Sequence, residues 1–257
     1  MSDDLLDLAT EAARVAGALL AERFGAEVAV VAKSTPTDLA SEADLAAERA
    51  IRSLLAEHRP DDALLGEEEG GAAGPLEPGR VRWVFDPLDG TINYLFGVPQ
   101  WCVSVACEDA DGALAGVILD PLRDELFAAT RTSGPLLDGV PVGASPARPL
   151  AESLVVTGFG YDAGVRARQA EIVARMLPAV RDVRRMGSAA LDMAWLAAGR
   201  YDAYFERGVQ PWDVAAGTLL CTRAGFEVRD LPARDGLPSG VLAGRGELLD
   251  ELASFGP

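Results

Sequence analysis

Acidic residues near the predicted ends of strands and helices are the side chains of this sequence best suited to chemistry. The densest group is the hexapeptide DPLDGT at residues 86–91, which follows an apolar strand predicted for residues 81–85. Asp86 is expected at the carboxyl end of that strand, the edge where α/β folds bind ligands. Asp86, Asp89 and the Leu88 carbonyl form a cluster of hard oxygen ligands, which suits Mg²⁺. A DPxD sequence alone is also typical of a strand-ending turn with two solvated acids.

The residues after the second aspartate suggest what such a metal would act on. Gly90 allows the backbone to approach a ligand closely, and Thr91 can cap the helix or turn that follows. Backbone N–H groups at such a start can bind phosphate. The hexapeptide therefore combines metal ligands, a phosphate cradle and a hydroxyl group.

Two further acidic segments strengthen this interpretation if the fold brings them to the same place. Glu67 follows the short apolar run 63–65, and Asp213 stands at the start of an alanine-rich helix, where an aspartate is also a common cap. Carboxylates gathered in one place repel one another and stay ionised together only when cations are bound. Bound metal ions would also explain how a protein of net charge −17 could hold an anionic substrate.

The scarcity of histidine and the scattered cysteines exclude several other mechanisms. His58 is the only histidine and lies at a polar helix end. An HExxH zinc site is therefore impossible, and a nucleophile activated by histidine has no supporting motif. Cys102, Cys107 and Cys221 are an odd number of scattered residues, which is typical of buried, reduced thiols.

The charge balance and hydropathy argue against several partners. The chain has 40 Asp and Glu residues against 23 Lys and Arg residues, so it lacks the basic excess that binding to nucleic acid or to an anionic membrane requires. No apolar run reaches the roughly 18 residues of a membrane span. The acidic segment 1–4 lacks the positive region of a signal peptide, so the expected location is the cytoplasm.

Hydrophobic periodicity predicts an α+β half at residues 1–145 and an α/β half at residues 146–257, with the best boundary at 143–149. In the first half, helices are expected at 5–24 and 41–57, and strands at 28–31, 63–65, 81–85, 103–107, 113–119 and 125–129. In the second half, strands are expected at 154–157, near 183, at 203–206 and at 241–243, and helices at 162–177, 189–198, 212–224 and 247–253. This pattern predicts two sheets packed in layers with helices.

Three motifs together resemble the inositol monophosphatase family. They are Gly66-Glu67-Glu68, the hexapeptide 86–91, and WDVAAG at residues 212–217, and their order and spacing fit from about Leu5 to Leu252. Weaker matches are Lys33, Asp38 and Asp44 in the segment 33–44, Gly187-Ser188-Ala189-Ala190, and Glu206. Departures occur at Phe85, Ile92 and Gly225-Phe226, none of which is a proposed ligand.

The resemblance implies a layered α-β-α-β-α sandwich and Mg²⁺-dependent hydrolysis of a small phosphate monoester, with inositol 1-phosphate as the foremost candidate. It implies metal binding by Glu67, Asp86, the Leu88 carbonyl, Asp89 and Asp213. Asp44 and Thr91 would position and activate the attacking water. The substrate would contact Asp89, Gly90, Thr91, Gly187, Ser188, Ala189 and Glu206. The first half would then carry most metal ligands, and the second half the last ligand and substrate-binding residues. Members are commonly homodimers and often lithium-sensitive, so both properties are expected here.

The sequence leaves several alternatives open. Relatives with the same metal motifs would act on histidinol phosphate, 3′-phosphoadenosine 5′-phosphate or fructose 1,6-bisphosphate, since the motifs specify the phosphate end and not the alcohol. Two non-enzyme alternatives are a structural divalent-cation-binding protein and a regulatory module that has lost turnover. Lys33 is either a phosphate or metal contact or a solvated residue, and Arg184 and Arg185 are predicted to be an exposed pair.

Overall fold

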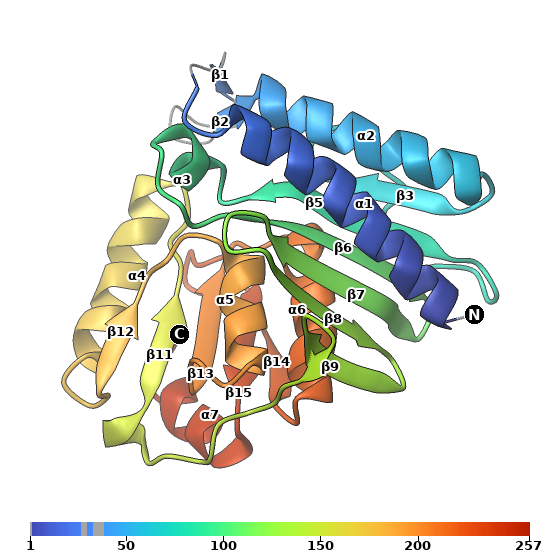
Figure 1. The fold of residues 1–257 in the computed structure, drawn as a ribbon. Coiled ribbons are helices and arrows are strands. Elements are labelled where there is room, and N and C mark those ends of the chain that lie inside the picture. The colour runs from blue at the N-terminus through green and yellow to red at the C-terminus, as the bar shows by residue number, and fades with distance from the viewer. Residues whose placement is uncertain (1, 27–29, 33–38) are drawn as a thin grey trace.

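The computed structural model describes residues 2–26, 30–32 and 39–257, and its elements form layers in the order helix, sheet, helix, sheet, helix (Figure 1). Helices α1 (Ser2–Arg23) and α2 (Glu42–His58) form one outer layer, and α5 (Ala189–Ala197) and α6 (Pro211–Arg223) lie between the sheets. Helices α4 (Ala163–Met176) and α7 (Gly246–Ala253) cover the far face of the second sheet. The predicted α-β-α-β-α sandwich is therefore confirmed.

The first sheet has eight strands in the order β10-β9-β8-β7-β6-β5-β3-β4. Neighbours are antiparallel except β3 and β5, which run parallel. The strands are β3 Ala63–Gly66, β4 Gly70–Gly71, β5 Arg82–Asp89, β6 Cys102–Asp109, β7 Gly112–Asp120, β8 Glu125–Thr130, β9 Ser133–Leu137 and β10 Val140–Pro141. Leu8, Ala12 and Leu20 of α1 are buried against this sheet because the apolar residues recur at helical spacing. Strands β1 (Val30–Ala32) and β2 (Leu39–Ser41) pair separately.

The second sheet has five strands in the order β12-β11-β13-β15-β14. They are β11 Leu154–Thr157, β12 Asp182–Arg184, β13 Ala203–Arg207, β14 Glu227–Leu231 and β15 Gly240–Gly244. The first three strands of that order run parallel, and β15 is antiparallel to both of its neighbours. Among the described residues, no helix is both long and apolar enough to cross a membrane.

The prediction that the strand before the hexapeptide ends at residue 85 is wrong. Strand β5 continues to Asp89, because Asp86 pairs with Ser104 and Asp89 pairs with Cys102 on β6. The register shifts between these two pairs. Pro87 has no N–H to donate to the neighbouring strand. The chain nevertheless forms a bulge around Pro87, and strand pairing resumes at Asp89.

Several short elements were not predicted, namely β2, β4, β9, β10, β14, α3 (Thr91–Leu95) and the 3₁₀ turn η1 (Leu150–Glu152). Three of these strands, β4, β10 and β14, lie at sheet edges, where glycine, proline and charged residues are tolerated.

The two sheets are connected in the chain by residues 142–149. Ile118 and Phe127 of the first sheet share an apolar cluster with Leu191 of α5 and Leu220 of α6. The division into two halves at residue 145 stays a prediction.

Candidate active site

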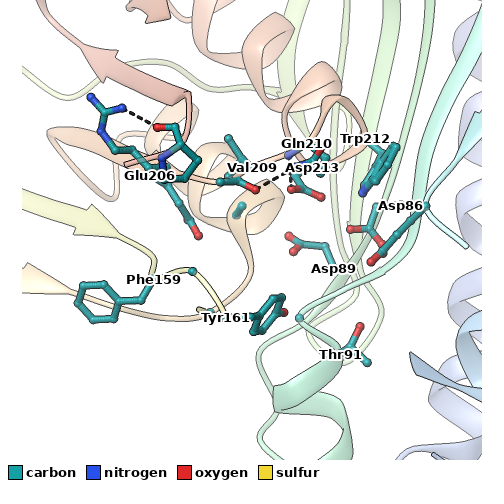
Figure 2. Close-up of a pocket in the computed structure, with 18 of the residues that line it drawn as sticks. Asp86, Asp89, Thr91, Phe159, Tyr161, Glu206, Val209, Gln210, Trp212 and Asp213 are labelled. Carbon is teal, nitrogen blue, oxygen red and sulfur yellow. Dashed lines mark hydrogen bonds between the residues drawn. The ribbon is translucent and has the colours of Figure 1, made fainter. Parts of the chain in front are cut away.

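The predicted acidic segments reach one cavity of about 470 Å³ that residues of both halves line (Figure 2). The predicted site residues that line it are Glu67, Asp86, Leu88, Asp89, Gly90, Thr91, Gly187, Ala189, Glu206 and Asp213. Asp44 and Ser188 do not line the cavity, but both contact residues that do. Lys33 and Asp38 lie outside the described residues.

The irregularity in β5 explains how Asp86 and Asp89 serve the same cavity. Residues three apart in a regular strand point to opposite faces of a sheet. Asp86 and Asp89 are three residues apart on β5, whereas their partners Ser104 and Cys102 are only two residues apart on β6. The extra residue of β5 forms a bulge, which brings the side chains of Asp86 and Asp89 to the same face of the sheet. The Leu88 N–H then donates to Asp86 Oδ1 at 2.9 Å and fixes that carboxyl group.

A buried glutamate that the sequence analysis did not identify holds the loop that carries Glu67. Glu48 of α2 is fully buried, and its carboxylate accepts hydrogen bonds from the N–H groups of Glu68 at 2.8 Å and Glu69 at 2.9 Å. Arg52 donates from Nε to Glu48 Oε1 at 2.8 Å. The turn after β3 is therefore shaped by α2, which lies in a different layer.

Two features of the sequence could have revealed Glu48. It lies four residues after Asp44 on the face of α2 that also carries the buried Ala47 and Ile51, so both acids occupy the apolar side of an amphipathic helix. A buried acid on such a face requires specific partners. Gly66 belongs to the same arrangement, because a Cβ at that position would lie 2.5 Å from Glu48 Oε1.

Asp213 reaches the cavity from the first turn of α6. Pro211 begins this helix, where its missing N–H costs nothing, and the Gln210 N–H donates to Asp213 Oδ2 at 2.7 Å. One carboxylate oxygen therefore caps the helix. Figure 2 shows the same carboxylate on the side of Asp89, so a capping role and a ligand role are compatible.

Crowding and burial raise the pKa values of these acids. Burial is the main cause for the pKa of Asp86, and repulsion from Glu67, Asp89 and Asp213 adds to it. Burial and then repulsion from Asp89 raise the pKa of Asp213. Burial raises the pKa of Asp89 to about 6, although hydrogen bonds from the start of α5 oppose the rise. A bound cation would act in the opposite direction, because positive charge favours the ionised carboxylates.

The donors fit a hard divalent cation. All the candidate ligands are carboxylate or carbonyl oxygens, which Mg²⁺ prefers. Within residues 2–26, 30–32 and 39–257, however, no group of three or more acidic, histidine or cysteine side chains already forms a metal site.

The structure brings Thr91 and Asp44 together. Thr91 Oγ1 lies 3.1 Å from Asp44 Oδ1 and 3.1 Å from the Leu88 carbonyl oxygen, two acceptors for its one proton. Asp44 is fully buried although it lies on a helix. Thr91 begins α3 instead of capping it, since the cap is Gly90 with φ of 100°. A Cβ at Gly90 would lie 3.0 Å from the Gln100 carbonyl oxygen, so this turn requires glycine.

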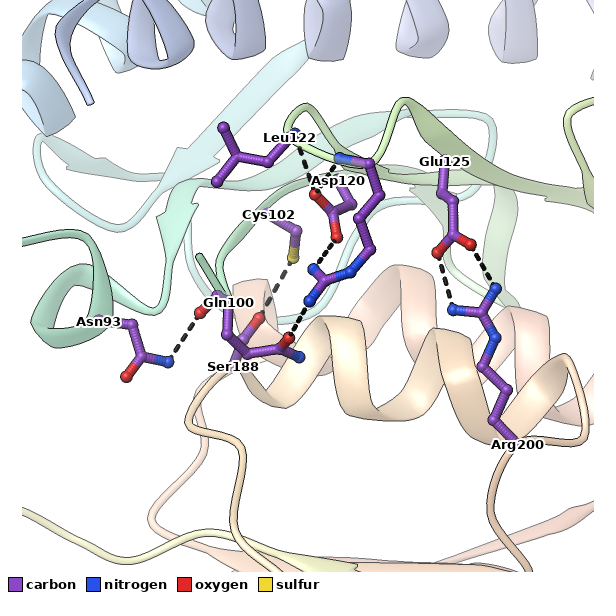
Figure 3. A network of polar contacts seen from close by, with 9 residues as sticks. Asn93, Gln100, Cys102, Asp120, Leu122, Glu125, Ser188 and Arg200 are labelled. Atoms are coloured by element: carbon purple, nitrogen blue, oxygen red, sulfur yellow. Dashed lines mark hydrogen bonds and ion pairs between the residues drawn. The ribbon is translucent and has the colours of Figure 1, made fainter. Parts of the chain in front are cut away.

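Asp89 is anchored to the start of α5. Its Oδ2 accepts hydrogen bonds from Ser188 Oγ and from the Ala190 N–H, both at 2.7 Å. Ser188 is buried, and its hydroxyl also lies 3.4 Å from the Cys102 thiol (Figure 3). The Ser188 side chain therefore faces Asp89 and not the cavity, whereas both of its chain neighbours line the cavity.

Asn93 ties the start of α5 to the segment that carries Thr91, and the sequence analysis did not identify it. Its Nδ2 donates to the Gln100 carbonyl at 2.7 Å, as Figure 3 shows, and to the Met186 carbonyl at 2.8 Å. One amide thus joins two chain segments that are 93 residues apart. No signal other than its place beside the hexapeptide could have indicated this role.

Glu206 lines the cavity from β13. Tyr204 Oη donates to Glu206 Oε2 at 3.2 Å, and a Cβ at Gly158 would overlap the carboxylate. Burial, followed by repulsion from Asp89, raises the pKa of Glu206 to about 7, while Arg185 acts in the opposite direction. Arg184 and Arg185 are both exposed, as predicted, but Arg185 also lines the cavity.

Known proteins resemble this chain over nearly its whole length. Residues 1–254 match the inositol monophosphatase family. An inositol-1-monophosphatase of Mycobacterium leprae is 44% identical over 246 residues, which cover 91% of this chain and 84% of that protein. The Nus factor SuhB of Escherichia coli K12 is 40% identical over 228 residues, which cover 88% of this chain and 85% of that protein. The extragenic suppressor protein suhB from Bartonella henselae, a solved structure, has a TM-score of 0.88 at 34% identity and 98% coverage of both chains. This chain therefore belongs to the inositol monophosphatase family and is a phosphatase.

Proposed function

We propose that this protein hydrolyses inositol 1-phosphate in a Mg²⁺-dependent reaction. The observation that carries the proposal is the convergence of four carboxylates, from three distant segments, on one cavity beside the Thr91–Asp44 pair. The printed name of the M. leprae relative supports inositol 1-phosphate among the possible esters. A protein that binds a cation only for structure would need neither the cavity nor the hydroxyl–carboxylate pair.

The proposed metal ligands are Glu67, Asp86, the Leu88 carbonyl, Asp89 and Asp213. When bound, Mg²⁺ would supply positive charge to the phosphate and lower the pKa of a bound water. Asp44 and Thr91 orient the attacking water: the Thr91 hydroxyl donates its proton to Asp44 or to the Leu88 carbonyl, which leaves its oxygen free to accept from water. The N–H groups of Gly90 and Thr91 hold the phosphate.

The alcohol part of the substrate lies toward the second half of the chain in this proposal. Glu206 accepts hydrogen bonds from its hydroxyl groups, and Gly187 and Ala189 complete that side of the cavity. Ser188 acts through Asp89, whose Oδ2 it holds. The homodimer, the cytoplasmic location and the lithium sensitivity stay predictions.

A substrate panel tests the assignment of the alcohol. Phosphate release should be measured from inositol 1-phosphate, histidinol phosphate, 3′-phosphoadenosine 5′-phosphate and fructose 1,6-bisphosphate in saturating Mg²⁺. We expect the highest kcat/KM for inositol 1-phosphate. A higher value for any other ester would overturn the substrate assignment while leaving the phosphatase chemistry in place.

Mg²⁺ should raise the melting temperature, because an ion that binds only the folded protein stabilises it. Asp213→Asn should weaken this response. The amide oxygen can still accept the hydrogen bond from the Gln210 N–H, but the side chain no longer carries the negative charge that attracts the metal. The measurement is a thermal melt with and without Mg²⁺, with the exposed Asp230→Asn as the matched control. An unchanged response in Asp213→Asn would reduce Asp213 to a helix cap.

Glu206 should make the stability of the metal-free protein depend on pH. Its pKa of about 7 in the folded state lies above the ordinary value of 4.5, so the folded state favours the neutral carboxyl. The stability that the folded protein gains from a neutral Glu206 carboxyl is fully present below pH 4.5 and is lost as the pH rises through 7. Melts in chelator should show that Glu206→Gln gains melting temperature relative to the wild type at pH 8 but not at pH 4.5. Equal differences at both pH values would contradict the raised pKa.

A further inference from the structure

The loop at residues 158–162 places an aromatic ring at the cavity that the proposed reaction does not use. Tyr161 is 44% exposed, yet it lines the same cavity as the acids. Figure 2 shows its ring extending from the loop into the cavity, on the side of Asp89. The same loop packs against Glu206 at Gly158, and Glu206 is the residue assigned above to the alcohol.

Hydrogen bonds from α4 fix the backbone that carries this ring. The Gly160 N–H donates to Oε1 of the buried Gln169 at 2.9 Å, and Arg166 donates to the Tyr161 carbonyl at 2.7 Å. Asp162 caps α4 by accepting from the Val165 N–H at 2.9 Å. The loop is therefore ordered before any substrate arrives, and an aromatic contact made from it costs little conformational entropy.

The cavity that Tyr161 lines offers apolar surface as well as hydrogen-bond acceptors. Val165, Val209 and Pro238 line the cavity together with Tyr161. Glu206 packs directly on the same loop, because a Cβ at Gly158 would lie 1.8 Å from its Oε1. A ligand in this cavity can contact both apolar surface and the Glu206 carboxylate, which suits a ring with an apolar face and peripheral hydroxyl groups.

We propose that Tyr161 is a specificity-determining residue that selects phosphate esters of ring-shaped alcohols over esters of acyclic ones. The ring of Tyr161 stacks on the C–H face of a cyclic alcohol, while Glu206 accepts hydrogen bonds from hydroxyl groups at the edge. An acyclic alcohol such as glycerol presents no continuous face to the aromatic ring. This inference rests on the proposed function and deepens it.

The test compares two phosphate esters in variants of the full-length protein. KM and kcat for inositol 1-phosphate and for glycerol 2-phosphate are measured in saturating Mg²⁺. Tyr161→Ala should raise KM for inositol 1-phosphate roughly 10-fold, the scale of a lost aromatic contact, and change KM for glycerol 2-phosphate less than about 2-fold. Tyr161→Phe keeps the ring and should keep both values. Leu177→Ala removes an exposed apolar side chain beyond α4 and should change neither.

The possible outcomes separate this inference from the function on which it rests. An equal change for both esters in Tyr161→Ala, or no change for either, would overturn the selection by Tyr161 while the phosphatase function stood. Loss of the inositol 1-phosphate preference in Tyr161→Phe would assign the effect to the hydroxyl and also overturn stacking. If the wild type releases no phosphate from either ester, the proposed function falls and the inference falls with it.

Discussion

Replacing Thr91 by alanine should lower kcat by roughly 10²-fold or more, the scale for a lost proton-transfer or positioning group. The Thr91 hydroxyl lies 3.1 Å from Asp44 Oδ1, so its removal leaves the attacking water without one of its two protein partners. KM should change little, because the backbone N–H at residue 91 remains to hold phosphate. The measurement is steady-state phosphate release from inositol 1-phosphate in saturating Mg²⁺.

Thr91→Ser is the matched control, since it keeps the hydroxyl and should keep most activity. The turn itself should survive both substitutions, because Gly90 and not the Thr91 side chain caps α3. The rise in melting temperature caused by Mg²⁺ should therefore be the same in wild type and in Thr91→Ala. A near-normal kcat in Thr91→Ala would exclude the proposed role of the hydroxyl.

Replacing Glu48 by alanine should lower the free energy of unfolding by about 3 kcal/mol or more, the scale for breaking a buried ion pair. The carboxylate is fully buried and accepts hydrogen bonds from Arg52 and from the N–H groups of Glu68 and Glu69. All three donors lose the Glu48 acceptor at once, although Arg52 keeps the Gly70 carbonyl as an acceptor. Because those N–H groups belong to the loop after Glu67, the melting-temperature response to Mg²⁺ should also shrink.

Denaturant unfolding in the absence of Mg²⁺ measures the first effect, and thermal melts with and without Mg²⁺ measure the second. Glu57→Ala is the control, because Glu57 is an exposed glutamate on the same helix and its removal should cost less than about 0.5 kcal/mol. Unchanged stability in Glu48→Ala would contradict the structural role of this residue. Lower stability with a normal Mg²⁺ response would show that it does not position Glu67.

The long, periodic elements of this fold could be predicted because their signal is local. Helices α1 and α2 and the apolar strands β6 and β7 follow from the spacing of their own residues. The path of the chain through the hexapeptide could not be predicted in this way. Pro87 argues for a strand end, but pairing of Asp89 with Cys102 carries β5 past it, and that pairing depends on a strand that follows later in the chain.

The candidate site shows the same division between local and distant signals. The types and order of Glu67, Asp86, Asp89 and Asp213 indicated hard oxygen ligands before their arrangement was known. The residues that hold these carboxylates in place carry no such local signal. Glu48 reaches the Glu67 loop across about 20 residues of chain, and Ser188 reaches Asp89 across 99, so the meaning of each depends on tertiary packing. Tyr161 resembles an ordinary loop residue until α4 and Glu206 are seen beside it.

Metal dependence of phosphate release from inositol 1-phosphate tests most directly whether the converging carboxylates form the catalytic metal site. Activity should be abolished in excess chelator and restored by Mg²⁺, whereas Ca²⁺ should restore it poorly because its longer and looser coordination disturbs the alignment of the attacking water with the phosphate. Full activity in excess chelator would contradict the account, because the carboxylates would then have no metal to bind.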